Sequence, residues 1–153
     1  MQVGGIYIWE RFPLHTDPTA PTKSRWFVYL GTTGPLQIHV SVFICTATTK
    51  LKHYGPGGSR QGHRVMRIQA GQYGFQQDCV IDVDIGTMDF PETIMTSRKS
   101  DINQMGQFQD QEMRQLWNLI RDSGEIPHIV KLDIRDSLQR SGLVNLKMPR
   151  SRH

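Results

Sequence analysis

Short runs of β-branched and aromatic residues fill the first half of the chain, and they constrain its fold more than any other feature. Clusters of Gly, Pro, Asp and Thr separate these runs, as turns separate strands. At least five strands are predicted, over residues 4–12, 25–31, 36–49, 63–69 and 73–85. This part of the chain is therefore expected to form a small, mainly β body.

After residue 84 the spacing of the apolar residues becomes helical. Four of them recur at i, i+3, i+4 and i+7, namely Met113, Leu116, Trp117 and Ile120. Asp110 is the predicted cap of this helix, and Gly124 is its predicted stop. The apolar stripe is expected to pack on the β body or in a dimer contact.

A second, shorter helix is predicted close to the C-terminus. Asp133 is its expected N-cap, Ile134 and Leu138 share one face, and Gly142 follows its end. The predicted fold class is thus mainly β with one longer and one shorter C-terminal helix. A chain of 153 residues suits one domain. We expect a single domain over residues 1–153, with a core at about 4–122 and a helical extension at 123–153.

The positive charge of the chain lies in its first half. Residues 1–77 hold eight Lys and Arg against two acidic residues, whereas residues 78–153 hold ten against twelve. Such a field attracts polyanions, nucleic acids among them. An ordinary solvated surface is the alternative, because clustering along the sequence need not be clustering in space.

Nothing in the sequence predicts export or membrane insertion. No run approaches the roughly 18 apolar residues of a membrane helix, and the N-terminal stretch lacks the pattern of a signal peptide. A cytoplasmic protein without membrane contact is expected. Cys45 and Cys79 lie in apolar, strand-like runs, which favours buried reduced thiols over a disulfide or a metal pair.

Two loops are candidates for function. The first is HTDPTAPTKS, residues 15–24, whose two prolines make it a possible lid. The second is HYGPGGSRQGHR, His53–Arg64, which is rich in glycine and basic residues and contains no acid. Long loops in compact domains often carry function. This one is interpreted as a nucleic-acid-contacting loop, a plain hairpin connection or, least of all, a nucleotide cradle, since it lacks the Lys-Ser/Thr pair of a phosphate loop.

Searches for known motifs narrow the chemistry. The chain has no Walker-type loop, no dinucleotide fingerprint, no HExxH and no CxxC pair. Its histidines share no ligand spacing, so neither a metal site nor a cofactor is predicted. The six are His15, His39, His53, His63, His128 and His153.

Arg, Thr and His side chains recur between residues 25 and 64. Cleaving an RNA phosphodiester through its own 2′-hydroxyl needs a base, an acid at the departing 5′-oxygen and donors for the charge on the phosphorus oxygens. Arginine offers bidentate donors, threonine a hydroxyl, and histidine titrates near neutrality. Each residue also has a plain structural role as an alternative. The candidates are Arg25, Thr46, Thr48, Thr49, His53, Arg60, His63 and Arg64.

Three aromatic residues near these positions are candidates for stacking on bases. Trp26, Tyr54 and Tyr73 would supply the flat faces that suit single strands in a positive groove. Core packing is the alternative, and for Trp26 it is the favoured one.

Four blocks of the sequence resemble the MazF/PemK (Kid) toxins of bacterial toxin–antitoxin pairs. GGIYIWERFPL is similar to their opening RGDIYxxDF, KSRWFVYLG to their xxRPVLVIS strand, and VFICTATTK to xxAAITSQ. AGQYGFQQDCVIDVDIGTMDF is similar to xxxxGLxxDSVIxxDQIRTID. The blocks keep the family's order over about residues 4–122. The chain departs from the pattern at Gly4-Gly5, where the family has an acid after the first glycine, and at Arg25-Trp26, where it has Arg-Pro.

The resemblance implies a small SH3-like barrel of the PemK/CcdB kind and a homodimer. It implies a toxin that acts as a metal-independent endoribonuclease on single-stranded RNA such as mRNA, leaves a cyclic phosphate and a 5′-hydroxyl, and is neutralised by a cognate antitoxin in the groove. Arg25 matches the family's catalytic arginine. Thr46 matches its transition-state-stabilising threonine, with Thr48 next if the alignment shifts by two. The loop at 13–23 resembles the mobile loop that covers RNA.

The loop His53–Arg64 takes the place of a variable loop in that family. Our hypothesis is that it lines the RNA groove, with His63 assisting proton transfer and Arg60 or Arg64 binding phosphate. Further basic side chains are expected to bind RNA, namely Lys23, Lys50, Lys52 and His53.

Two other functions are compatible with the sequence. One is a non-enzymatic gyrase poison of the CcdB kind, which shares the barrel and acts through C-terminal helix residues. The other is a barrel that binds nucleic acid without catalysis. The Arg and Thr blocks favour the ribonuclease, because the gyrase-binding branch lacks that pair.

Overall fold

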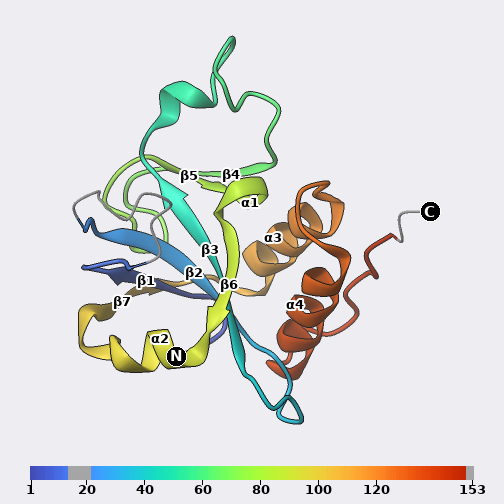
Figure 1. The fold of residues 1–153 in the computed structure, drawn as a ribbon. Coiled ribbons are helices and arrows are strands. Elements are labelled where there is room, and N and C mark those ends of the chain that lie inside the picture. The colour runs from blue at the N-terminus through green and yellow to red at the C-terminus, as the bar shows by residue number, and fades with distance from the viewer. Residues whose placement is uncertain (14–21, 151–153) are drawn as a thin grey trace.

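A curled antiparallel sheet forms the body of the protein (Figure 1). The computed structural model describes residues 1–13 and 22–150. Seven strands occur in these residues, in the order β4-β5-β3-β2-β1-β7, with β6 paired to β3 off this path. They are β1 (Gly5–Trp9), β2 (Arg25–Thr32), β3 (Ser41–Thr48), β4 (Val65–Ile68), β5 (Cys79–Asp82), β6 (Thr87–Pro91) and β7 (Ile102–Gln107). The sheet curls into a half-barrel.

Strand β3 is the centre of the sheet. Its first half pairs with β6 from Ser41↔Pro91 to Cys45↔Thr87, and its end pairs with β5 through Thr48↔Val80. On its other edge it pairs with β2. The side chains of β3 alternate between two apolar clusters, because successive residues of a strand point to opposite faces. Both faces are covered, which explains why the strand reads as a continuous apolar run.

Two helices cover one face of the sheet. They are α3 (Asp110–Asp122) and α4 (His128–Arg140), which lie together on one side of the strands in Figure 1. The predicted stripe is confirmed as core, since Met113, Leu116, Trp117 and Ile120 are all buried in the larger apolar cluster. The shorter helices α1 (Val83–Gly86) and α2 (Glu92–Ser97) flank β6, and η1 (Leu51–His53) and η2 (Lys99–Asp101) are 3₁₀ turns.

The helix boundaries correct three expectations. The N-cap of α3 is Gln109, whose capping box with Glu112 takes the place expected for Asp110. The second helix begins at His128 after Pro127, five residues before the predicted cap Asp133. Both helices therefore have 13 residues, and the prediction of one longer and one shorter helix is wrong. Proline holds an extended backbone at the N-cap, which lets the helix start earlier than the Asp signal indicated.

The strand predictions hold for the buried runs and fail at polar ones. Residues 36–40 precede β3 instead of belonging to it, and Leu36 and Ile38 are exposed in that connection. The run 73–85 contributes only β5, which ends at Asp82 because that side chain caps the turn of helix that follows. Strands β6 and β7 were not predicted. The sequence INQMGQ of β7 carries almost no β-forming residues, and these strands form by pairing with β3 and β1, respectively.

Three further predictions concern the cysteines, the candidate lid and membrane insertion. Cys45 and Cys79 are buried free thiols, as predicted. The candidate lid at 15–24 lies largely outside the described residues. Within the described residues, no helix is long and apolar enough to cross a membrane.

Candidate functional site

Arg25 and Thr48 lie at neighbouring strand ends. Arg25 begins β2 and Thr48 ends β3, and the two strands are antiparallel with Phe27 opposite Thr46. Continuing this register places Arg25 beside Thr48. Arg25 is half-buried, and its guanidinium makes no hydrogen bond or ion pair with any other described residue. A partly buried guanidinium with unused donors is suited to bind an anionic group.

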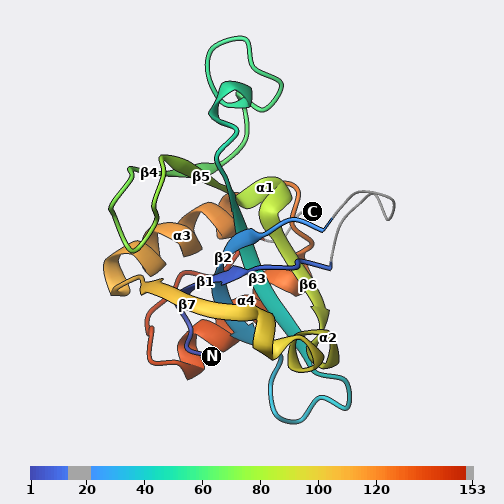
Figure 2. The same cartoon turned by 90° about the vertical axis from the view of Figure 1, so that its left-hand side faces the viewer.

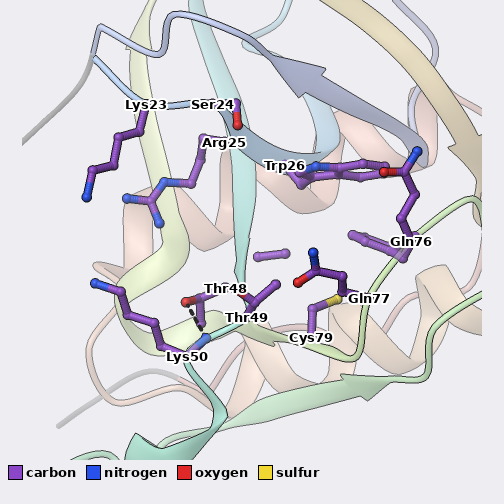
Figure 3. A pocket seen from close by; sticks show the side chains of 12 residues that line it. Lys23, Ser24, Arg25, Trp26, Thr48, Thr49, Lys50, Gln76, Gln77 and Cys79 are labelled. Carbon is purple, nitrogen blue, oxygen red and sulfur yellow. Dashed lines mark hydrogen bonds between the residues drawn. The ribbon is translucent and has the colours of Figure 1, made fainter. Parts of the chain in front are cut away.

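Two pockets lie beside Arg25 and Thr48. We call the first the β2–β3 pocket (Figure 3). It has a volume of about 440 Å³. Figure 3 shows the cations Lys23, Arg25 and Lys50 on one side and Trp26 with Gln77 on the other. Phe75 and Cys79, both buried, complete its wall. The pocket thus combines positive charge with an aromatic ring and side-chain amides.

The second pocket, called here the Asp82 pocket, adjoins the first. It has a volume of about 290 Å³ and shares Arg25, Thr48 and Lys50 with the β2–β3 pocket. Thr46, Arg60 and the buried Asp82 line it as well. Arg25 and Thr48 therefore lie where the two pockets meet.

The two threonines differ in their hydrogen bonds. Thr46 Oγ1 donates to the carbonyl of Gly86 at 3.4 Å, near the limit of such a bond. Thr48 Oγ1 accepts from the backbone N–H of Lys50 at 3.2 Å, so its own proton stays available. The hydroxyl of Thr48 is the better placed donor for a group bound at Arg25.

A buried carboxylate organises the wall of the Asp82 pocket. Asp82 Oδ1 accepts from the backbone N–H groups of Asp84 and Ile85 at 3.0 and 3.2 Å. Its Oδ2 accepts from the Tyr54 hydroxyl at 2.8 Å and lies 2.7 Å from Nδ1 of His63. Because a carboxylate only accepts, Nδ1 carries the proton of that bond and Nε2 is the other ring nitrogen.

Tyr54 links the carboxylate to an arginine. Arg60 donates to the Tyr54 hydroxyl at 3.2 Å, and its guanidinium lies 5.8 Å from the centre of the Tyr54 ring. Burial raises the pKa of Tyr54, so the phenol stays protonated. Arg60 is thereby held at the rim of the Asp82 pocket.

The loop His53–Arg64 projects from the end of β3, beyond the sheet (Figure 2). After η1 it has no helix or strand, as predicted, but it is closed by its own hydrogen bonds. The N–H of Arg60 donates to the carbonyl of His53 at 2.8 Å, and Gly57 donates to Gln61 Oε1 at 3.1 Å. Gly58 packs on the same carbonyl of His53, so closely that a Cβ there would lie 2.4 Å from its oxygen.

The structure brings together some of the predicted site residues and separates others. Lys23, Arg25, Thr46, Thr48, Lys50 and Arg60 line the two pockets. His63 lines neither pocket, but it is hydrogen-bonded to Asp82, which lines the Asp82 pocket. Arg64 lines a different pocket, beside the connection between α3 and α4. Lys52 and His53 line neither of the two pockets.

The three candidate stacking residues also separate. Tyr54 is buried on Asp82, and Tyr73 packs edge-on against Phe108 and donates to Glu112. Trp26 is half-buried, stacks on Phe75 and borders the β2–β3 pocket. Only Trp26 among the three is placed for a ligand there.

Sequence reasoning missed Asp82, Gln76 and Gln77. One signal pointed to Asp82: it is a charged residue inside the apolar run CVIDV, and a buried strand tolerates a charge only when partners pair with it. The glutamines had none, since exposed amides occur in any loop. Their position at the pocket depends on how the segment 69–78 folds back onto the sheet.

Comparison with known proteins adds no assignment to this geometry. The chain matches no family model and no curated protein sequence. The arrangement of side chains around the two pockets is therefore the basis for a functional assignment.

Proposed function

We propose that this protein is a metal-independent endoribonuclease that cleaves single-stranded RNA through the 2′-hydroxyl. The observation that carries the proposal is the half-buried guanidinium of Arg25, which has no hydrogen bond or ion pair to another described residue and lies beside Thr48 where the two pockets meet. Two guanidinium N–H groups and the Thr48 hydroxyl would bind the phosphorus oxygens, on which charge grows in the transition state. Lys23 and Lys50 would hold the neighbouring phosphates.

We assign the proton transfer to His63, which lines neither pocket itself but is hydrogen-bonded to Asp82 in the wall of the Asp82 pocket. Asp82 holds its Nδ1, so the neutral ring offers Nε2 as the acceptor. The 2′-oxygen bonds to phosphorus as its proton passes to Nε2. The bond from phosphorus to the 5′-oxygen breaks, and that oxygen takes a proton from water. The products are a 2′,3′-cyclic phosphate and a 5′-hydroxyl.

The same proposal extends to the family and the partners. The four sequence blocks and the curled, mainly β sheet with helices on one face support a MazF/PemK-like toxin with an SH3-like barrel. Such a toxin would act in the cytoplasm as a homodimer. A cognate antitoxin would neutralise it by covering the groove at Arg25.

The decisive experiment incubates the purified protein with a mixed single-stranded RNA, with EDTA and with Mg²⁺ in parallel, and maps the cut ends. Discrete cleavage in both, leaving 5′-hydroxyl ends, is the expected result. Arg25→Ala is expected to abolish cleavage and leave the thermal unfolding curve unchanged, because Arg25 has no partner to lose among the described residues. Arg98→Ala, at an exposed arginine outside both pockets, is the matched control.

Failure of this test would point elsewhere in a defined way. Growth arrest on expression with intact RNA would favour the gyrase poison. Salt-sensitive RNA binding without any product would favour a non-catalytic binding barrel.

A further inference from the structure

One half of the β2–β3 pocket has no cationic side chain among its lining residues. The cations gather at its Arg25 side, whereas Trp26, Gln76 and Gln77 occupy the opposite side (Figure 3). The indole of Trp26 is half-buried and stacks on the buried ring of Phe75, with 5.2 Å between ring centroids and 29° between ring planes. The stacking holds the indole in place, and the ring borders the pocket.

Two side-chain amides lie next to that ring. Gln76 and Gln77 are exposed, and their amide groups make no hydrogen bond to any described residue. Each amide offers a donor and an acceptor. In Figure 3 the amide of Gln76 lies at the edge of the Trp26 ring, and that of Gln77 points into the pocket.

The segment that carries the glutamines is fixed to the sheet. The N–H of Gly71 donates to the carbonyl of Phe75 at 2.7 Å, and the N–H of Ala70 donates to Asp78 Oδ1 at 2.7 Å. Gly74, with a φ of +87°, lies so close to the backbone of Met105 in β7 that a Cβ would collide with it. The two amides are therefore presented at a defined place.

We propose that Trp26, Gln76 and Gln77 form a subsite for one unpaired nucleobase, next to the phosphate site at Arg25. This inference rests on the proposed function, because it takes single-stranded RNA as the ligand. A base would stack on the indole and be read along its edge by the two amides, which is how unpaired bases are recognised in general. The volume of about 440 Å³ lies in the range of small-ligand sites.

The chemistry of the wall favours a base over a peptide side chain. A flat ring with two amides beside it, neither hydrogen-bonded to another described residue, matches a planar, hydrogen-bonding ligand, and the cations across the pocket match its phosphate. The subsite would thus set which nucleotide is accepted beside the bond that is cut, a property that the pair Arg25 and Thr48 cannot supply.

The test uses four five-nucleotide homopolymers built on 2′-deoxyribose, of A, C, G and U, which bind but cannot be cut for want of the 2′-hydroxyl. The full chain is expected to prefer one base by roughly tenfold or more, as one good amide contact provides. The double variant Gln76→Ala/Gln77→Ala is expected to reduce the spread to about threefold or less, whereas Gln115→Ala, at an exposed glutamine of α3, keeps it. Trp26→Leu is expected to lower all four affinities by roughly 5- to 150-fold, the range of base stacking.

The outcomes separate this inference from the proposed function. RNA cleavage with an unchanged base preference in the glutamine variant would overturn the subsite and leave the ribonuclease standing. A base preference lost in that variant, without any RNA cleavage by the full chain, would support the subsite and overturn the ribonuclease. Equal or absent binding of the four homopolymers by the full chain would overturn the subsite. Because the glutamines are exposed, their variant tests the proposal even if Trp26→Leu fails to fold.

Discussion

Nδ1 of His63 lies 2.7 Å from Oδ2 of Asp82, a carboxylate whose residue is only 2% exposed. The same oxygen accepts from Tyr54. Tyr54 and His63 lie near the two ends of the loop His53–Arg64, so one carboxylate at the end of β5 holds both ends of the loop against the sheet. Asp82 thereby positions the histidine to which proton transfer is assigned and the arginine that reaches its pocket.

Replacing Asp82 by Asn is expected to loosen this loop. Asparagine keeps one oxygen for the N–H groups of α1, but it puts an amide donor where Oδ2 met Tyr54 and His63. We expect the free energy of unfolding to fall by roughly 1–3 kcal/mol, the cost of leaving buried polar groups poorly paired. Urea unfolding and limited proteolysis within residues 53–64 measure both effects.

The matched control is Asp89→Asn, at an exposed carboxylate on β6. It is expected to change the stability by no more than about 0.5 kcal/mol. An equal loss of unfolding free energy and equal proteolysis in the two variants would show that the contacts of Asp82 do not hold the loop.

Much of the fold followed from the sequence because its elements bury apolar residues in regular patterns. The strands β1, β2, β3 and β5 are apolar runs, and α3 has a clear stripe of Met113, Leu116, Trp117 and Ile120. Strands β6 and β7 escaped prediction; the polar sequence of β7 gains strand structure only from pairing with β1. The start of α4 was misplaced because a proline, rather than the Asp133 carboxylate, sets it.

The candidate site was predictable only in part. Arg25 and Thr48 are distant in sequence, and the pairing of β2 with β3 brings them together. No local pattern links His63 to Asp82, which follows 19 residues later. No local pattern shows that Arg60 and Arg64 line different pockets either. Those relations depend on the path of the loop, which glycine-rich sequence does not specify.

Thr48→Val is expected to reduce cleavage more than Thr46→Val. Valine keeps the shape and the β-branch of threonine and removes only the hydroxyl. The loss at Thr48 is expected to be roughly 100-fold or more, as for removal of one transition-state donor. Single-turnover cleavage of a short RNA measures it, and the reverse order of the two variants would assign the role to Thr46, which the sequence alignment favours.

Lys50→Ala is expected to weaken RNA binding and its dependence on salt. Lys50 lines both pockets and is exposed. Loss of one phosphate contact lowers the slope of log K against log salt by about 0.7 for a single strand. Lys147→Ala, outside both pockets, is expected to keep the slope. Anisotropy titrations at several salt concentrations give both slopes, and an unchanged slope for Lys50→Ala would remove it from the interface.

The two thiols are expected to resist labelling in the folded protein, and Cys79 is expected to react faster than Cys45. Burial raises the pKa of Cys45 to about 12 and that of Cys79 to about 11. At pH 8 the thiolate, which is the reactive form, therefore makes up about 10⁻⁴ of Cys45 and about 10⁻³ of Cys79. Raising the pH towards 11 therefore speeds labelling, and Cys79 also borders the β2–β3 pocket. Mass spectrometry after timed alkylation measures the order; labelling of Cys45 first would contradict it.

Gly58→Ala tests whether the loop His53–Arg64 contacts RNA or merely connects two strands. A Cβ at Gly58 would lie 2.4 Å from the carbonyl oxygen of His53, so the loop has to open, whereas a Cβ at Gly62 meets nothing within 4 Å. Gly62→Ala is thus the matched control. If the loop contacts RNA, Gly58→Ala is expected to lower RNA affinity by roughly tenfold, since a displaced loop loses the contacts that Arg60 makes at the pocket. The loop projects beyond the sheet, so the thermal unfolding of the body should change little. Full affinity in both variants, with faster proteolysis of Gly58→Ala alone, would show that the loop opens without consequence and is only a hairpin connection.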